Sequence, residues 1–325
     1  MSGRHRVDAP QSVQVEAARG LVTIQDGGRW GAQRIGVSVG GAMDARAALL
    51  ANVLAGNGRG TALIEIGWEA ALTLSFPQGA GLVLAGVGME ATLQTGRVPL
   101  WSPHRLEPGS LLHCRVTEGR FGYLACAGGL VVPPVFGGLG TDLRSGWGGF
   151  EGRTLRAGDR LTLGGEGGER PLRPRSLAPG LRPPYRVDPT LRILKGSHWG
   201  HFPEDHLRVF LTHPYAVTAL SDRMGYRLSG VPVAPDPALE VDSEPVTAGS
   251  IQIPPDGQPI VLMADRPTVG GYPRIGEVIS SDLPLLAQLR PGDPVQFRVV
   301  DHAEALRSQL DFEAHLQRLV IALRG

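Results

Sequence analysis

The chain has 325 residues and a formal net charge of +1, from 32 basic and 31 acidic side chains. The length favours two domains, and the balanced charge, without a basic run or patch, argues against nucleic-acid binding. No apolar run is long enough to span a bilayer, and the N-terminal residues lack the apolar core of a secretory signal. We therefore expect a soluble, cytoplasmic protein that binds neither nucleic acid nor membrane.

Short runs of Val, Ile and Leu alternate with many of the 46 glycines and 27 prolines, a pattern typical of short strands joined by tight turns. Strands are predicted at residues 62–66, 71–76, 81–86 and 260–265. Helices are few, and apolar spacing predicts them at residues 42–56, 203–212 and 303–323. Because closure removes exposed sheet edges, many strands with few helices favour two small β-barrels with peripheral helices.

Two cysteines lie on neighbouring predicted strands, residues 111–116 and 123–128, joined by a turn at 117–120. If these strands form a hairpin, Cys114 faces Tyr123 and Cys126 faces Leu111, so the thiols are not cross-strand neighbours. We interpret both as buried, reduced cysteines.

The two sides of the chain share an ordered pattern. A Gly-Tyr strand start, an Asp-Leu pair and a Leu-Arg-x-Gly-Asp turn occur near the end of each side, the turns at residues 155–159 and 289–293. Residues 106–114 use the same turn-then-strand pattern more loosely. The segments SVGGAMDARAALLANVL and TALSDRMGYRL also occupy comparable positions, which indicates an internal duplication.

A stretch rich in Gly, Pro and Arg separates the two sides. The expected domains are residues 14–164 and 191–300, with a linker at 165–190 and a C-terminal helix at 301–325.

The segment SDRMGYRL places an acid, a guanidinium and a phenol close together. Arg223 could bind a carboxylate or carbonyl at two points, and Tyr226 could exchange a proton. Asp222 could act with them, although an Asp–Arg pair that only fixes a turn explains the motif equally well. Asp44, at the start of the first predicted helix, suits the helix dipole and is a further candidate for proton transfer.

Further polar side chains follow on predicted turns. Gln252 and Gln258 flank an Asp-Gly turn and could recognise an amide through their donors and acceptors. Close by, Gly270, Gly271, Tyr272 and Arg274 combine a double glycine with an Arg–Tyr pair, which fits either close backbone approach to a ligand or a β-bulge. The histidines lack metal-binding spacing, so no metal site is predicted.

Four of these segments together resemble the biotin-dependent carboxyltransferase family across roughly residues 15–300. They read GLVTIQDGGRWGAQRIGVSVGGAMDARAALLANVLAGN, SDRMGYRL, GSIQIPPDGQPIVLMAD and GGYPRIGEVISSDLPLLAQLRPGD. The family includes the KipA-type C subunit of bacterial 5-oxoprolinase, allophanate hydrolase subunit 2 and the carboxyltransferase domain of urea carboxylase. The resemblance implies two cyclophilin-like β-barrel domains arranged as an internal duplication.

The resemblance also implies a function in a complex. A KipI-type protein (the B subunit) and a LamB/YcsF-type protein (the A subunit) would join this chain in the ATP-dependent opening of 5-oxoproline to glutamate. No GxxxxGK[ST] phosphate loop is present, so ATP is expected on the complex rather than clearly on this chain. Two alternatives stay open: carboxyl transfer from carboxybiotin to urea or a similar amide, and KipA-type regulation through a KipI-type kinase inhibitor.

Under the enzymatic interpretation, Arg223 and Arg274 would anchor a carboxylate or phosphate, and Gln252 and Gln258 would recognise the amide. Tyr226, Asp222 or Asp44 would handle protons. One segment departs from the family pattern, because residues 195–199 read KGSHW where a proline-glycine turn is common.

Overall fold

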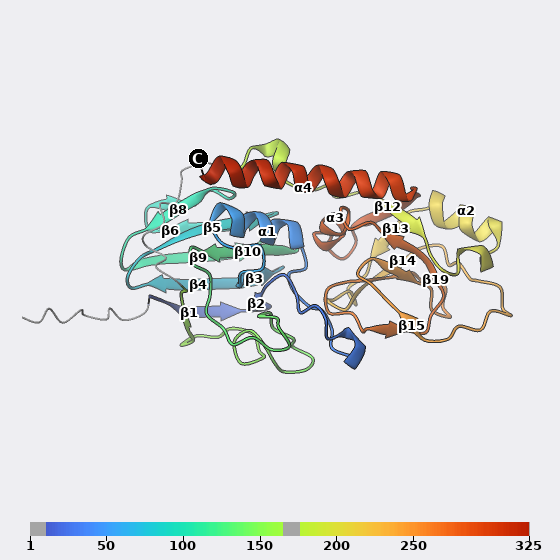
Figure 1. The fold of residues 1–325 in the computed structure, drawn as a ribbon, viewed down its shortest axis with the longest axis horizontal. Helices are drawn as coiled ribbons and strands as arrows, with labels where there is room; N and C mark the ends of the chain where they lie inside the picture. The colour runs from blue at the N-terminus through green and yellow to red at the C-terminus, as the bar shows by residue number, and fades with distance from the viewer. Residues whose placement is uncertain (1–10, 165–175, 325) are drawn as a thin grey trace, which may run out of the picture.

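A computed structural model of the chain describes residues 11–164 and 176–324. Within them the protein is mainly strand with four α-helices, and its two halves lie side by side beneath one long C-terminal helix (Figure 1). The predicted mainly-β class with few helices is thus confirmed.

Two sheets that enclose a common hydrophobic core form the first half. Their strand orders are β11-β1-β4-β9-β6-β7 and β2-β3-β10-β5-β8. The bounds are β1 (Ser12–Arg19), β2 (Val22–Gln25), β3 (Leu63–Gly67), β4 (Ala71–Phe76), β5 (Ala80–Gly86), β6 (Met89–Leu93), β7 (Gly96–Arg97), β8 (Pro103–Leu106), β9 (Ser110–Val116), β10 (Phe121–Cys126) and β11 (Arg160–Thr162). A short 3-10 turn, Gln33–Ile35, precedes helix α1 (Ala45–Leu54).

The predicted hairpin between the two cysteine-bearing strands is wrong. β9 pairs with β4 and β6, so Cys114 faces Leu72 and Ala91, whereas β10 pairs with β3 and β5, so Cys126 faces Leu82. The reason is burial: every residue of β10 is buried, while β9 alternates buried and exposed positions along most of its length. A strand buried on both faces belongs in a covered sheet, and an alternating strand fits a sheet with one solvent face. Both thiols are free and buried, as predicted.

A closed barrel of seven strands forms the second half, in the order β12-β19-β16-β17-β14-β13-β20. β12 and β20 pair in parallel, and the other neighbours are antiparallel. The bounds are β12 (Thr190–Lys195), β13 (Tyr215–Val217), β14 (Gly225–Ser229), β16 (Ser250–Gln252), β17 (Ile260–Leu262), β19 (Arg274–Val278) and β20 (Pro294–Val299), with β15 (Glu244–Pro245) and β18 (Val269–Gly270) as a separate pair. The helices are α2 (Glu204–Thr212) and α3 (Leu283–Ala287), with a 3-10 turn at Trp199–His201.

The repeated Leu-Arg-x-Gly-Asp motif makes the same turn in both halves. The Asp159 carboxylate accepts the N–H of Arg156 at 2.8 Å, and the Asp293 carboxylate accepts the N–H of Arg290 at 2.7 Å. The motif glycines have φ of 90° and 93°, a region that favours glycine. The shorter pairing of SVGGAMDARAALL with TALSDRMGYRL is wrong, since the first enters a helix and the second enters strand β14.

Both halves contribute to one hydrophobic cluster, which includes Trp101 and Tyr123 from the first and Ile193 and Phe297 from the second. The predicted linker falls partly outside the described residues, at 165–175. The rest of it, residues 176–190, contains a 3-10 turn at Pro179–Leu181 and seats Leu177, which is 2% exposed.

The C-terminal helix α4 (His302–Arg324) crosses both halves (Figure 1). Within α4, Leu316 is 1% exposed, whereas Leu306 and Leu310 are exposed. The helical spacing of leucines that predicted this helix therefore does not mark a single buried face.

Candidate functional site

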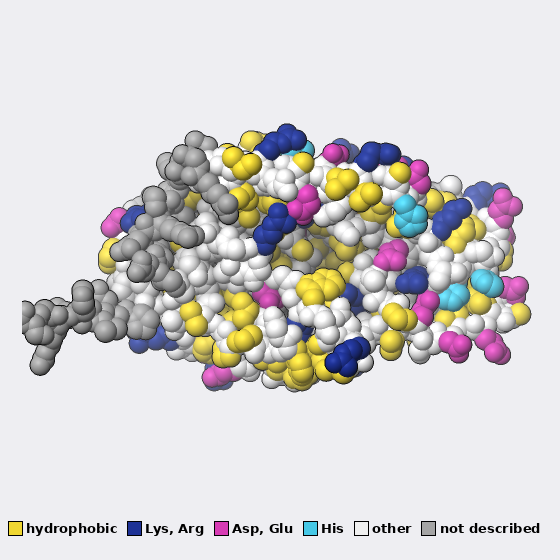
Figure 2. Space-filling view, in the orientation of Figure 1, with side chains coloured by type: hydrophobic (Ala, Val, Ile, Leu, Met, Phe, Trp, Pro, Cys, Tyr) yellow, Lys and Arg dark blue, Asp and Glu magenta, His cyan; other side chains and the backbone are white. Residues whose placement is uncertain are grey.

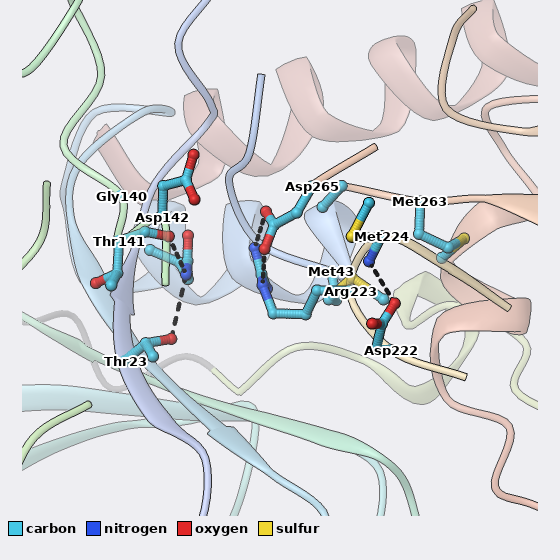
Figure 3. A network of polar contacts seen from close by, with 12 residues as sticks. Thr23, Met43, Gly140, Thr141, Asp142, Asp222, Arg223, Met224, Met263 and Asp265 are labelled. Carbon is cyan, nitrogen blue, oxygen red and sulfur yellow. Dashed lines mark hydrogen bonds and ion pairs between the residues drawn. The ribbon is translucent and has the colours of Figure 1, made fainter. Parts of the chain in front are cut away.

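Arg223 joins the two halves through buried polar contacts (Figure 3). Its Nε and Nη2 donate to the Asp265 carboxylate at 2.7 and 2.9 Å. Nη2 also donates to the carbonyl of Gly41 at 2.6 Å, and Nη1 donates to the carboxylate of Glu65. The residue is only 6% exposed. Arg223 therefore binds the protein's own acids, and its guanidinium is not open to a ligand anion.

Glu65, on β3, is fully buried and receives donors from several directions. Its Oε2 accepts the N–H of Met43 at 2.8 Å and the hydroxyl of Tyr123 at 2.9 Å. Burial raises the pKa of Glu65, and the charge of Arg223 opposes that rise. Burial alone would lower the pKa of Arg223, but Glu65 and Asp265 outweigh it and raise the value above the ordinary range. Since every contact of Glu65 is a donor to it, the geometry fits an ionised pair.

Asp44 extends this network to the linker and to α3. It is the N-cap of α1, with Oδ1 accepting the N–H of Ala47 at 2.9 Å, so it precedes the first turn in which the sequence pattern placed it. Its Oδ2 accepts the Tyr185 hydroxyl at 2.6 Å and the Gln288 amide at 2.9 Å. Burial raises the pKa of Asp44, and the hydrogen bonds from Gln288 and Tyr185 partly counter it. With no exposed surface, its carboxylate is occupied by structural donors.

Gln288, which sequence reasoning missed, lies at the end of α3 and is hydrogen-bonded to the backbone of the first half. Its Oε1 accepts the N–H groups of Arg120 and Phe121 at 3.0 and 3.1 Å. Its Nε2 donates to the Phe121 carbonyl at 2.9 Å as well as to Asp44. The one available signal was an amide side chain at the end of the apolar run LPLLAQL.

Tyr226 and Asp222 lie near Arg223 in different environments. Tyr226 is fully buried, donates to the Ala287 carbonyl at 2.8 Å, and lies beneath the Arg120 guanidinium at 4.6 Å. Burial raises its pKa above the ordinary range. Asp222 is exposed and accepts the N–H groups of Met224 and Gly225 at 2.8 and 3.2 Å. Asp222 therefore fixes a turn, as the structural alternative expected, but through backbone N–H groups and not through the predicted pair with Arg223, which binds Glu65 and Asp265 instead.

The two glutamines predicted to bind an amide are separated. Gln258 binds the backbone of Gly230 twice, accepting its N–H at 2.8 Å and donating to its carbonyl at 3.2 Å. Gln252 is 5% exposed, and its Nε2 has no hydrogen-bond partner among the described residues. A Cβ at Gly270 would approach that nitrogen to 2.3 Å, so a larger residue there would have to displace the end of the Gln252 side chain.

Arg274 lies on β19, beside the segment that departs from the family pattern. Its Nε is 3.3 Å from the Ser197 hydroxyl and 3.3 Å from Glu244 Oε1, and its backbone N–H donates to His198 Nδ1 at 3.1 Å. Its Nη1 is 3.9 Å from Glu277 Oε2. Arg274 is therefore also paired with the protein's own acids.

The remaining two predicted residues of this region are near Arg274 in the chain. Tyr272 is 45% exposed, and a Cβ at Gly271 would lie 3.6 Å from the Ser243 hydroxyl, in ordinary contact. Arg223, Tyr226 and Asp44 thus meet in the interface network, while Gln252 and Arg274 lie on the barrel strands β16 and β19 and Gly270 lies on β18, close to Gln252.

An interdomain cleft of about 450 Å³ lies between the halves, lined by residues 26–46 of the first and 247–284 of the second. The face in Figure 2 is hollowed between the halves. The two walls of the cleft are joined directly by hydrogen bonds. Gly40 donates its N–H to the Ala264 carbonyl at 3.1 Å, and the Ser38 hydroxyl donates to the Arg266 carbonyl at 2.8 Å. Arg223 holds one wall through Gly41. Four charged residues line the cleft: Asp26, whose carboxylate accepts the N–H groups of Gly28 and Leu139, and Arg46, Arg266 and Glu277, which sequence reasoning missed.

A second cavity, of about 510 Å³, is lined by Trp68, Leu143 and Met224 together with Asp222 and Arg223. Its charged residues include Arg223 and Asp265, which already bind each other. The interdomain cleft is therefore the best candidate for a small-molecule site.

Among the described residues, no group of three or more His, Cys, Asp or Glu side chains could hold a metal ion. The helices in this part of the chain also lack the length and hydrophobicity needed to span a membrane.

Known proteins share both the sequence and this architecture. The chain is 38% identical over 306 residues to the C subunit of 5-oxoprolinase from Escherichia coli, covering 93% of this chain and 96% of that protein. It is 35% identical to the C subunit of 5-oxoprolinase from Haemophilus influenzae, covering 94% and 97%. The solved urea amidolyase of K. lactis superposes with a TM-score of 0.88 at 25% identity, covering 97% of this chain and 20% of that one.

A family model described as the carboxyltransferase domain, subdomain A and B, matches residues 35–299. This match takes in the second wall of the cleft, residues 39–46 of the first wall, and the interface network from Gly41 to Gln288. The chain therefore belongs to the carboxyltransferase domain family, subdomains A and B.

Proposed function

We propose that this chain is the C subunit of an ATP-dependent 5-oxoprolinase that opens 5-oxoproline to L-glutamate together with two other subunits. The observation that carries the proposal is the match to the Escherichia coli protein, which spans 96% of that relative at 38% identity. The urea amidolyase of Saccharomyces cerevisiae is 28% identical, and only 16% of its length is covered. The partners would be a KipI-type protein and a LamB/YcsF-type protein.

The contribution of this chain would be a shaped cleft for the substrate. Opening the lactam breaks the ring C–N bond and adds water across it, so the ring must be held with its carbonyl accessible. The network of Arg223, Glu65 and Asp265 fixes the backbone around Gly41 on one wall. We assign this positioning role to Arg223, Asp44 and Tyr226. Their polar atoms are hydrogen-bonded to other groups of the protein, and none of the three residues lines the cleft.

The sequence contains no phosphate loop that could bind ATP. The single lysine, Lys195, is exposed and lies 5.4 Å from the ring of Trp199, and no phosphate-loop motif precedes a helix. We therefore place the nucleotide on one of the partner proteins. The free, buried Cys114 and Cys126 fit a reducing compartment such as the cytoplasm.

Carboxyl transfer is the second candidate, supported by the family description and by the fold shared with K. lactis urea amidolyase. It would require a biotin carrier on another polypeptide. A regulatory protein that binds a KipI-type inhibitor would need a partner-facing surface but not the cleft.

The deciding experiment is reconstitution of the chain with its KipI-type and LamB/YcsF-type partners. We expect glutamate release from 5-oxoproline that requires ATP and all three proteins. Ala248→Trp would fill the cleft that Ala248 lines, and should abolish release while leaving the complex assembled. Ala238→Trp, at an exposed position, is the matched control and should remain active.

Other results would reject the proposal. Carboxylation of urea with a carboxylated biotin carrier, without glutamate release, would favour carboxyl transfer. Full glutamate release by the Ala248→Trp complex would remove the cleft from the reaction.

A further inference from the structure

Two arginines line the interdomain cleft without an acidic partner. Arg266 is 6% exposed, its Nη1 donates to the carbonyls of Met263 and Ala264 at 3.3 and 3.5 Å, and its buried Nε has no partner among the described residues. The buried Nη2 of Arg46 is also unpartnered there, and its guanidinium lies 3.9 Å over the Phe312 ring. Neither guanidinium forms an ion pair within the described part of the chain.

Most of the acids that face these arginines are occupied. Asp282 and Asp44, which face Arg46, are held by Arg192 at 2.6 Å and by Tyr185 and Gln288. Glu277 and Asp265 face Arg266; Asp265 is held by Arg223, and Glu277 does not reach ion-pair distance of Arg266 among the described residues. Burial accordingly lowers the pKa of both Arg46 and Arg266. A buried charge without a partner is unfavourable. Two such charges on one cavity therefore favour the binding of an anion that would neutralise them.

Both side chains are positioned by the fold rather than by each other. The backbone of Arg266 is tied to the opposite half through Ser38 at 2.8 Å. Arg46 is in the first turn of α1, whose N-terminal N–H groups also favour negative charge. Arg46 borders in addition a smaller cavity of about 190 Å³ beneath α4, which is also lined by Phe312, the ring under its guanidinium.

Glu277 adds an acceptor to the same cleft. Its Oε1 accepts the hydroxyl of Thr247, and its Oε2 lies 3.9 Å from Arg274 Nη1. Its charge also acts on Arg266. A cleft with two unpaired cations and one available carboxylate oxygen matches a small molecule that carries both a carboxylate and an N–H donor. Neutral urea could accept a hydrogen bond at its carbonyl oxygen but carries no negative charge to pair with the two arginines.

We propose that Arg46 and Arg266 bind the carboxylate of a small amide ligand while Glu277 accepts its N–H. The identity of that ligand rests on the proposed function, under which it is 5-oxoproline, with its carboxylate and its lactam N–H. This assigns to Arg46 and Arg266 the anchoring role that the sequence pattern gave to Arg223 and Arg274, because the latter two are already paired.

The test compares 5-oxoproline with its neutral carboxamide in the assembled complex. Calorimetry gives the affinity for each compound, and turnover gives KM and kcat for 5-oxoproline. The variants are Arg46→Gln, Arg266→Gln and Arg266→Lys, with Arg208→Gln as control at an exposed position on α2. We expect each Gln variant to lose about tenfold or more in affinity for 5-oxoproline, the loss of a charge-assisted hydrogen bond, with little change for the carboxamide. Arg266→Lys should restore part of the loss.

The melting temperature of the ligand-free protein separates an anchoring role of Arg266 from a structural one. Because the charge of Arg266 is unpaired without ligand, we expect Arg266→Gln to leave the melting temperature unchanged or raise it. A structural role predicts that the same variant lowers it. 5-Oxoproline should raise the melting temperature of the unmutated chain but not of Arg266→Gln.

The outcomes separate this inference from the proposed function. Normal turnover with unchanged KM in both Gln variants overturns the arginine site and leaves the function standing. Binding of 5-oxoproline that Arg266→Gln abolishes, in a complex without turnover, supports the site and rejects the function. If neither 5-oxoproline nor inorganic phosphate, used as a simple anion probe, binds the unmutated protein, the site is rejected.

Discussion

Replacing Arg223 with methionine tests whether the interface network holds the two halves together. The change removes the donors to Glu65, Asp265 and Gly41 at once. Glu65 is fully buried and would keep its charge without a counter-ion, whereas the Asp265 side chain is 14% exposed and can reach water. The cost therefore comes mainly from Glu65, and breaking such a buried pair destabilises by about 3–5 kcal/mol.

The pH dependence of this loss has a definite sign. Burial raises the pKa of Glu65, and without Arg223 nothing of comparable strength opposes the rise. The folded variant then binds a proton more tightly than the unfolded chain does, so the penalty is fully present above the raised pKa. It should shrink as the pH falls through that pKa towards the ordinary range of a glutamate.

Urea denaturation at about pH 8 and about pH 5.5 measures both effects. Arg223→Met should be several kcal/mol less stable at the higher pH and closer to the unmutated protein at the lower one. Adding Glu65→Gln should restore much of the loss, because the amide oxygen still accepts from Met43 and Tyr123. Arg227→Met, exposed on the same strand, is the control. A loss below about 1 kcal/mol, the range of a surface pair, or no rescue by Glu65→Gln, would refute the reasoning.

Three further predictions concern the core, a turn and the thiols. Leu316→Ala, at 1% exposure in α4, should cost about 2–5 kcal/mol in urea denaturation, whereas Leu310→Ala, at 57% exposure, should cost about 0.5 kcal/mol or less; equal effects would contradict this packing of α4. Gly292→Ala, at φ 93°, should cost about 1–3 kcal/mol by the same assay, and a neutral result would mean that the turn tolerates a side chain. Burial raises the pKa of Cys114 and Cys126 to about 12, so a thiol reagent at about pH 8 should label them only after denaturation; rapid labelling of the native protein would show that they are accessible.

Local chemistry in the sequence was enough for several features of the fold. The repeated Leu-Arg-x-Gly-Asp turn was recognisable because a glycine at positive φ and an aspartate that accepts a nearby N–H both act within four residues. The helix that begins after Asp44 could be predicted for the same reason, since its cap and apolar face lie within one short segment.

Strand partners were not encoded in such short segments. β9 and β10 are neighbours in the chain, but they join different sheets because β10 is buried on both faces and must pack beneath α1. A two-strand comparison cannot show this, because the burial of one face is supplied by other elements.

The candidate site divides in the same way. The sequence alone indicated a mainly-β chain with a repeated turn, and it proposed Arg223 as an anion anchor and Asp44 as a proton-transfer residue. Only the tertiary structure decided that Arg223 would be paired, because its partner Glu65 lies 158 residues away on β3. The same packing left Arg46 and Arg266 without acidic partners in the interdomain cleft. Charge pairing depends on distances of a few ångströms in a dry interface, and those distances are set by how the two halves pack.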